Sequence, residues 1–200
     1  MAAQPGDYAT PNATSLSTQA SPMTLVLDAR DASRGLMYSH LTIPVAPGPF
    51  TLVYPKWIPG EHGPTGPLND LAALRVSADG HPITWRRDKV NMYAFHVMVP
   101  SGVSSLTVDY DVILNAPGDT MATKNLAIVN WNRDLLYQSN TNSHDVFVKT
   151  SLILPNGWSF GTALPQPKQT GTRVDFAEVP LAMLIDSPLD MGHFAKRLVL

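Results

Sequence analysis

Apolar and polar residues alternate along most of the chain after residue 22, which is the pattern of half-buried β-strands. The clearest run spans residues 106–114, where leucine, valine and tyrosine occupy every second position. Shorter or weaker runs of the same kind span residues 23–28, 37–45, 50–54, 93–99, 126–131, 146–154, 158–160 and 173–176. Strands that recur about every 8 to 12 residues are typical of a β-sandwich or a large antiparallel sheet.

One hairpin and one helix stand out among these strands. Asp79-Gly80 separates residues 74–77 from residues 83–85, and this dipeptide supplies the positive φ angles of a type I′ turn. Residues 180–185 start with proline and continue with apolar residues, as in the first turn of a short helix. We therefore predict an all-β domain, either an antiparallel sandwich or a large curved, saddle-like sheet, with at most one or two short helices.

The first 22 residues are rich in serine, threonine, proline and alanine. Such a segment cannot bury enough apolar surface to offset its ordering entropy, so we expect residues 1–22 to form a disordered tail or linker and residues 23–200 to form one β domain. The segment lacks the basic and apolar regions of a signal peptide. It is also compatible with the start of an exported protein, so we expect a periplasmic or secreted location, with the cytoplasm as the alternative.

Composition and charge narrow the classes of partner. The 200-residue chain has 18 prolines, no cysteine and two glutamates, Glu61 and Glu178. A formal charge of −2 argues against nucleic acid and an anionic membrane surface as main partners, and no apolar run is long enough to span a bilayer. Without cysteine, disulfides and thiolate chemistry are excluded.

Residues 54–70, YPKWIPGEHGPTGPLND, form the most unusual stretch of the chain. Prolines and glycines surround an adjacent glutamate and histidine, and Pro59-Gly60 fits the central positions of a type II turn. Prolines stiffen a loop at low entropy cost, so the loop holds Trp57, Glu61 and His62 in fixed directions. Two interpretations stay open: a binding loop, or a rigid connector whose tryptophan fills the core while the glutamate and histidine are solvated.

The Glu61-His62 pair does not predict a zinc helix. Zinc peptidases place two histidines four positions apart on a helix, but the position four after His62 is Gly66, and prolines flank the pair. The six histidines are scattered along the sequence, so any metal site would have to be assembled by the fold. A packed or partly exposed strand position is expected for three of them: His40, His81 and His96.

The residues themselves show no catalytic set. The sequence has no G-x-S-x-G elbow of a serine hydrolase and no glycine-rich phosphate-binding motif. A glycosidase would need two carboxylates that face each other. The sequence has enough aspartates for such a pair, but Asp109 and Asp111 are expected on a solvated strand face. The protein is therefore predicted to be a β domain without catalytic or metal-binding residues.

Several motifs, taken in order, resemble one known family. They are YPKWIPGEHGPTGP (54–67), WRRDKVNMYAFHV (85–97), NLAIVNWNRDLLY (125–137), GWSFGTALP (157–165) and LIDSPLDMG (184–192). Over residues 23–200 the sequence looks like the N-terminal region of the glycyl aminopeptidase family, the PDZ-bearing zinc metallopeptidases of peptidase family M61. One departure is Gln138, where the family is expected to continue from Leu-Leu-Tyr into proline.

The resemblance implies a division of labour between two domains. A downstream thermolysin-like domain holds the HExxH helix and the zinc, whereas the N-terminal all-β domain packs on it and helps to wall the substrate cleft. The substrates implied are peptides with a small N-terminal residue, glycine or alanine. For the present protein the resemblance implies no catalytic residue, no cofactor of its own and no activity when alone.

The resemblance also suggests roles for the proline-rich loop. Four residues become candidates for a substrate-cleft or interdomain loop: Trp57, Glu61, His62 and Thr65. Glu61 would neutralise the α-ammonium of the substrate, an interaction that gains strength in a water-poor cleft. The surface that meets the catalytic domain is expected to be an exposed apolar patch.

An alternative from a different class stays open, a stand-alone β-sandwich module that binds glycans or another protein. It would need exposed aromatic side chains, for which the candidates are Trp57, Trp85, Trp131 and Trp158. Core packing is the more common fate of tryptophan. A native gene that continues into an HExxH segment would exclude this alternative.

Overall fold

The computed structural model describes residues 14–58, 60–114 and 121–195. Within these ranges the protein is built from strands and loops, with one α-helix and two short 3-10 helices. These helices are α1 (Leu181–Ile185), η2 (Ala32–Arg34) and η3 (Trp131–Arg133). The all-β class and the short helix predicted from the sequence are both confirmed. No helix in the described part is long and apolar enough to cross a membrane.

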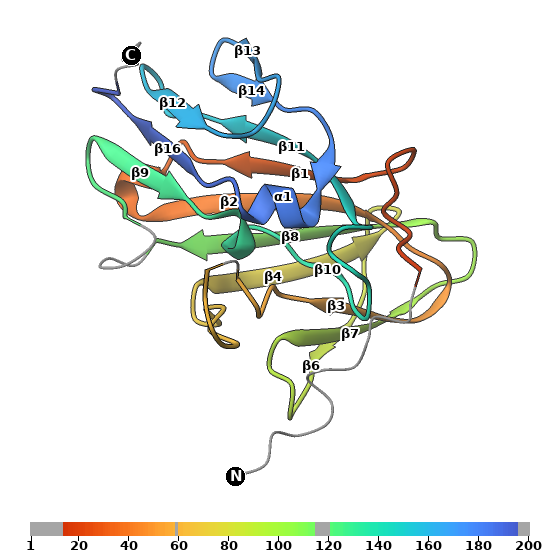
Figure 1. Cartoon of the computed structure of the whole chain (residues 1–200). Helices are drawn as coiled ribbons and strands as arrows, with labels where there is room; N and C mark the ends of the chain where they lie inside the picture. The colour runs from red at the N-terminus through yellow and green to blue at the C-terminus, as the bar shows by residue number, and fades with distance from the viewer. Residues whose placement is uncertain (1–13, 59, 115–120, 196–200) are drawn as a thin grey trace.

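The largest sheet runs across the molecule (Figure 1). Its strands, in spatial order, are β13 (Lys168–Thr170), β14 (Arg173–Asp175), β11 (Phe147–Ile153), β1 (Met23–Asp28), β2 (Leu36–Pro44), β8 (Ser105–Ile113), β4 (Leu71–Ala78) and β5 (His81–Pro82), and β15 (Val179–Pro180) pairs with β11. All pairs are antiparallel except β1 with β11, which is parallel. This one departure from the predicted pairing arises because β1 and β11 are distant in sequence, so no hairpin dictates their relative direction.

Two smaller antiparallel sheets complete the fold. One contains β10 (Tyr137–Gln138), β3 (Gly48–Val53), β7 (Ala94–Val99) and β6 (Trp85–Arg87), and the other contains β12 (Ser159–Thr162), β16 (Leu189–Gly192) and β9 (Leu126–Val129). In Figure 1, α1, β9 and β16 lie over one face of the large sheet, whereas β3, β7 and β6 lie beyond β4. The arrangement is sandwich-like, with open sheets.

One continuous core joins the three sheets. Alternate residues of the central strands are fully buried, among them Met23, Leu25 and Leu27 of β1, Leu41 and Ile43 of β2, and Leu106, Val108 and Val112 of β8. The smaller sheets contribute Leu52, Phe95, Val129, Leu189 and Met191 to the same core. The period-two pattern therefore places one face of each strand inside, because successive side chains of a strand point to opposite faces.

The predicted hairpin has the expected turn but a different second strand. Asp79 and Gly80 have φ angles of 48° and 78°, as a type I′ turn requires. The returning strand is the short β5 (His81–Pro82), after which the N–H of Ile83 still donates to the carbonyl oxygen of Val76 in β4 over 2.9 Å. Trp85 instead begins β6 and pairs with Val97 in the second sheet. The proline in β5 has no N–H to donate, which keeps this edge strand short.

The described residues before β1 lie against the domain. The side chain of Gln138 accepts a hydrogen bond from the N–H of Leu16 over 3.0 Å and donates one to the carbonyl oxygen of Thr14 over 3.2 Å. Proline, the residue expected here from the family resemblance, has no side-chain group that forms hydrogen bonds. The rest of the expected tail, residues 1–13, lies outside the described residues.

Candidate functional site

The 54–67 loop is closed at its base by one glycine. The N–H of Gly66 donates to the carbonyl oxygen of Lys56 over 3.0 Å. A β-carbon on Gly66 would overlap the carbonyl oxygen of Pro55, so this close approach requires glycine. The hydroxyl of Tyr93 donates to the carbonyl oxygen of Gly66 over 2.6 Å. These contacts hold the two ends of the loop together.

A tight turn inside the loop orients Glu61. Its N–H donates to the carbonyl oxygen of Ile58 over 3.0 Å, and Gly60 has a φ of 83°, the value at the third position of a type II turn. Pro59, the expected second position, lies outside the described residues. The hydroxyl of Thr65 donates to Oε2 of Glu61 over 3.3 Å. The turn and the hydroxyl together direct this carboxylate.

The four candidate residues of the loop are divided between two hollows. Trp57 is 45% exposed and lines an apolar hollow, so it does not fill the core. Glu61 and Thr65 line a second, polar hollow. His62 is exposed and lines neither of the two. The loop therefore separates two surfaces of different chemistry.

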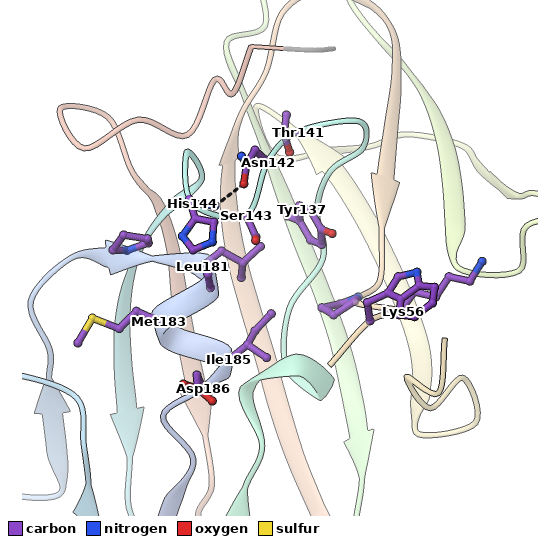
Figure 2. A pocket seen from close by; sticks show the side chains of 14 residues that line it. Lys56, Tyr137, Thr141, Asn142, Ser143, His144, Leu181, Met183, Ile185 and Asp186 are labelled. Atoms are coloured by element: carbon purple, nitrogen blue, oxygen red, sulfur yellow. Dashed lines mark hydrogen bonds between the residues drawn. The ribbon is translucent and has the colours of Figure 1, made fainter. Parts of the chain in front are cut away.

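The apolar hollow lies between the 54–67 loop and α1 and has a volume of about 720 Å³ (Figure 2). Figure 2 shows α1 on one side, Lys56 on the other, and Tyr137 with the 141–144 turn between them. Most of its lining is apolar or aromatic: Pro55, Trp57, Tyr137, Pro180, Leu181, Ala182, Met183 and Ile185. Met183 is 41% exposed, so large apolar side chains meet solvent on both sides of this hollow.

The polar hollow adjoins the apolar one at the end of α1, because Ile185 and Asp186 line both. Its volume is about 430 Å³. Three segments form its walls, the 54–67 loop, η3 with its flanking residues, and the segment from α1 into β16. The polar residues among its lining are Glu61, Thr65, Asn130, Asn132, Arg133, Asp186 and Asp190.

Trp131 fixes two of these walls relative to each other. Its side chain is fully buried in η3, and its Nε1 donates to the carbonyl oxygen of Ser187 over 2.8 Å. Ser187 lies between α1 and β16, next to Asp186. One buried contact therefore sets the distance from Asn132, the residue after Trp131, to the carboxylate of Asp186.

Arg133 is held by groups on several elements. Its guanidinium pairs with the carboxylate of Asp70, which is 2% exposed. Its carbonyl oxygen accepts hydrogen bonds from the hydroxyls of Tyr54, over 2.6 Å, and Tyr110, over 3.2 Å. The positive charge in the wall of the polar hollow is therefore balanced by a buried carboxylate.

The next residue, Asp134, is fully buried, and neither of its carboxylate oxygens has a hydrogen-bond partner among the described residues. Burial raises the pKa of this carboxyl well above its ordinary value, and the charge of Arg133 offsets this only in part. The charge of Asp70 raises the pKa further. The fold therefore favours the neutral carboxyl of Asp134 more than water does.

Three exposed carboxylates border the polar hollow: Glu61, Asp186 and Asp190. Thr65 donates a hydrogen bond to the first of these, whereas the two aspartates form no ion pair within the described part of the protein. Because Asp70 balances Arg133, the border carries net negative charge. Such a border favours a positively charged group.

Among the described residues, no group of three or more His, Asp or Glu side chains is placed to hold a metal ion. His40 pairs with Asp109 over 2.7 Å across β2 and β8, and His96 pairs with Asp88 over 2.8 Å. The hydrogen bond from His96 is the main cause that lowers the pKa of Asp88. His81 is exposed in β5, so all three histidines expected in strands lie there.

The exposure of the four tryptophans tests the alternative of a stand-alone module that binds glycans or another protein, which would need exposed aromatic side chains. Trp131 and Trp158 are buried, and Trp85 packs edge-on against Phe95 with ring centroids 5.7 Å apart. Trp57 is therefore the one largely exposed tryptophan in the described residues. A glycan-binding surface uses several exposed aromatic rings, and three of its four candidates serve packing instead.

Reasoning from the sequence missed three residues of the polar hollow, Asn132, Asp186 and Asp190. They lie far from Glu61 in the sequence, and no local spacing connects them. The family motifs at 125–137 and 184–192 do contain all three. Those motifs indicated the family but not a site, because only the fold shows that the two segments and the loop around Glu61 line the same hollow.

Residues 24–193 match the family model for the peptidase M61 N-terminal domain. The chain belongs to this family. The match covers β1 through β16, and it includes both the 54–67 loop and the segments that form the two hollows. No curated protein matches this M61 domain in sequence.

Solved structures share the fold of the M61 domain. An aminopeptidase N family protein from Idiomarina loihiensis superposes with a TM-score of 0.72 at 17% identity, over 85% of this chain and 29% of that chain. Yeast LTA4 hydrolase superposes with a TM-score of 0.53 at 10% identity, over 88% of this chain and 29% of that chain. The M61 domain therefore spans less than a third of either structure, and identities this low establish likeness of fold alone.

Proposed function

We propose that the protein is the non-catalytic N-terminal β domain of a zinc-dependent aminopeptidase that removes small N-terminal residues, glycine or alanine. The observation that carries this proposal is the match to the peptidase M61 N-terminal domain over residues 24–193. In this proposal the partner is a downstream catalytic domain, and the substrate is the free N-terminus of a peptide. The 54–67 loop forms part of the wall of the substrate cleft.

The zinc of the proposed enzyme belongs to the catalytic domain. The described residues of the M61 domain do not fit a zinc site, because no three His, Asp or Glu side chains converge there. The loop around Glu61 and His62 is built from turns rather than from the helix that an HExxH site needs. The contribution of the M61 domain is therefore to bind and orient the substrate.

Glu61 is the proposed partner of the substrate α-ammonium. It is exposed at the border of the polar hollow, and the Thr65 hydroxyl and the Ile58–Glu61 turn fix its direction. A preoriented carboxylate pairs with an ammonium at little entropic cost. The pair gains strength when the catalytic domain covers the hollow and excludes water.

The test is Glu61→Gln in the full-length enzyme, with kcat/KM measured on a glycyl substrate. We expect a loss of about 10-fold or more, the effect of removing one charged hydrogen-bonding partner. Glu178→Gln is the matched control, because the other glutamate of the sequence is exposed and lines neither hollow. A loss of less than about twofold for Glu61→Gln would contradict the role proposed for this loop.

The apolar hollow is the proposed contact with the catalytic domain. Trp57 and Met183, on its two sides, are exposed large apolar side chains, and a covering domain would remove them from water. Trp57→Ser should therefore lower the melting temperature of the full-length enzyme more than that of the M61 domain alone. Equal shifts in the two proteins would argue against a domain contact at this hollow.

A further inference from the structure

Asn132 is a largely buried polar residue whose side chain has no hydrogen-bond partner among the described residues. It is 6% exposed and lines the polar hollow. Its side-chain amide forms no hydrogen bond within the part of the protein that the structure describes. Neither atom of this amide is among the enclosed side-chain atoms that lack a partner in the described residues, so the amide reaches the solvent in the hollow. The amide of Asn132 is therefore available to a ligand that enters the hollow.

The other residues around the hollow supply charge of one sign. Asp186 and Asp190 lie on the α1–β16 side, and Glu61 lies on the loop side of the same hollow. The one positive side chain of the described lining, Arg133, is already paired with the buried Asp70. The hollow thus combines a negative border with a neutral amide that both donates and accepts hydrogen bonds.

We infer that the polar hollow is a binding site for the free amino terminus of a peptide, in which Asn132 hydrogen-bonds the first peptide group. The α-ammonium is a cation and lies within one residue of a backbone carbonyl and a backbone N–H. The carboxylates match the ammonium, and the side-chain amide of Asn132 matches the adjacent peptide group. The volume of about 430 Å³ is in the range of small-ligand sites.

This inference rests on the proposed function for its substrate class and adds two points to it. Asn132 is a binding residue for substrate, in addition to Glu61. The site also lies within the M61 domain itself, because η3, the loop and the α1–β16 segment form its walls, so the 200-residue protein binds peptides without the catalytic domain. The alternative ligand is a lysine side chain, which carries the same ammonium group but has no backbone amide next to it for Asn132 to bind.

The experiment titrates the 200-residue protein with triglycine amide and follows backbone amide resonances by NMR. We expect shifts at residues 130–133 and 186–190, and loss of binding when the peptide is N-acetylated. N-acetyl-glycyl-lysine amide, which keeps a side-chain ammonium, should bind at least about fivefold more weakly than triglycine amide. Equal binding of free and acetylated triglycine amide overturns the inference, as does lysine-peptide binding as tight as that of triglycine amide.

Asn132→Leu should weaken the binding of triglycine amide by about fivefold or more, the loss expected for one or two hydrogen bonds. Leucine has nearly the same shape, and thermal unfolding shows whether the variant folds. Asp190→Asn is a second, exposed variant, which should also weaken binding. Asp145→Asn, an exposed aspartate outside both hollows, should bind normally. If Asn132→Leu folds and binds triglycine amide with unchanged affinity, the role of Asn132 is overturned. If Asn132→Leu does not fold, Asp190→Asn decides, and unchanged affinity in that variant overturns the site.

The outcome separates this inference from the proposed function. If the 200-residue protein does not distinguish free from acetylated peptide but Glu61→Gln still impairs the full-length enzyme, the inference fails and the proposed function stands. If the 200-residue protein binds free N-termini but Glu61→Gln leaves the enzyme unchanged, the site in the M61 domain stands and the proposed catalytic contribution of Glu61 fails.

Discussion

Trp131 and Ser187 are joined by a hydrogen bond from the indole Nε1 to the carbonyl oxygen, 2.8 Å long and fully buried. The bond connects η3 to the segment between α1 and β16. These two adjoining segments carry Asn132 and Asp186, which both line the polar hollow. A core contact thus determines the shape of a surface site.

Trp131→Phe should destabilise the protein by about 1–3 kcal/mol, because it removes the main donor to a buried carbonyl and leaves a small void. For a protein of this size the melting temperature should fall by about 2–4 °C for each kcal/mol, which thermal unfolding followed by circular dichroism measures. Trp158→Phe is the control, since Trp158 is also largely buried but its indole N–H donates to no residue in the described part of the protein. Equal shifts for the two variants would show that this bond contributes little.

Gly66→Ala should open the 54–67 loop, because the new methyl group overlaps the carbonyl oxygen of Pro55. We expect a loss of about 1–3 kcal/mol, as for other overpacked sites, and faster amide hydrogen exchange at Gly66 and its neighbours. Gly63→Ala is the matched control in the same loop. A β-carbon there comes no nearer than 3.8 Å to its closest neighbour, Thr65, so the change should stay within about 0.5 kcal/mol. Similar exchange rates in the two variants would contradict a loop closed by Gly66.

Asp134 should make the folded state less stable as pH rises. Burial raises the pKa of its carboxyl in the folded protein, so above the unfolded value of about 3.9 the native state holds a proton that the unfolded state has lost. The stability contributed by this proton is complete below that pH and is lost as pH rises through the folded pKa. The expected sign is opposite to that of an aspartate in a salt bridge.

Asp134→Leu should remove this dependence, since leucine is similar in size and does not titrate. The variant should gain stability relative to the parent protein as pH rises from about 4 to neutral, because an unpaired buried carboxyl is replaced by an apolar group. Urea unfolding at a series of pH values measures the difference. Asp145→Asn, at an exposed aspartate, should follow the parent curve. If the free energy of unfolding changes with pH in the same way for Asp134→Leu and for the parent protein, the pKa of Asp134 is not raised by folding and this prediction is wrong.

Local pattern predicted most of the strands, and the reason is physical. Alternating residues such as Leu106 and Val108 are buried because a strand turns every second side chain to the same face, whatever its neighbours are. The type I′ turn at Asp79-Gly80 was predictable for a similar reason, since its positive φ angles are a property of those two residues. Trp85 was misassigned because its pairing with Val97 depends on a strand from another part of the sequence.

The sequence by itself determined the all-β class, the tight turn before Glu61 in the 54–67 loop, and the family resemblance. The tertiary structure alone decided that Trp57 and Glu61 line different hollows, that β1 and β11 pair in parallel, and that Asn132, Asp186 and Asp190 meet the loop. Backbone propensity and turn geometry act over a few residues and can be read locally. The meeting of distant segments depends on how their apolar faces share one core, and no spacing within a single segment encodes that.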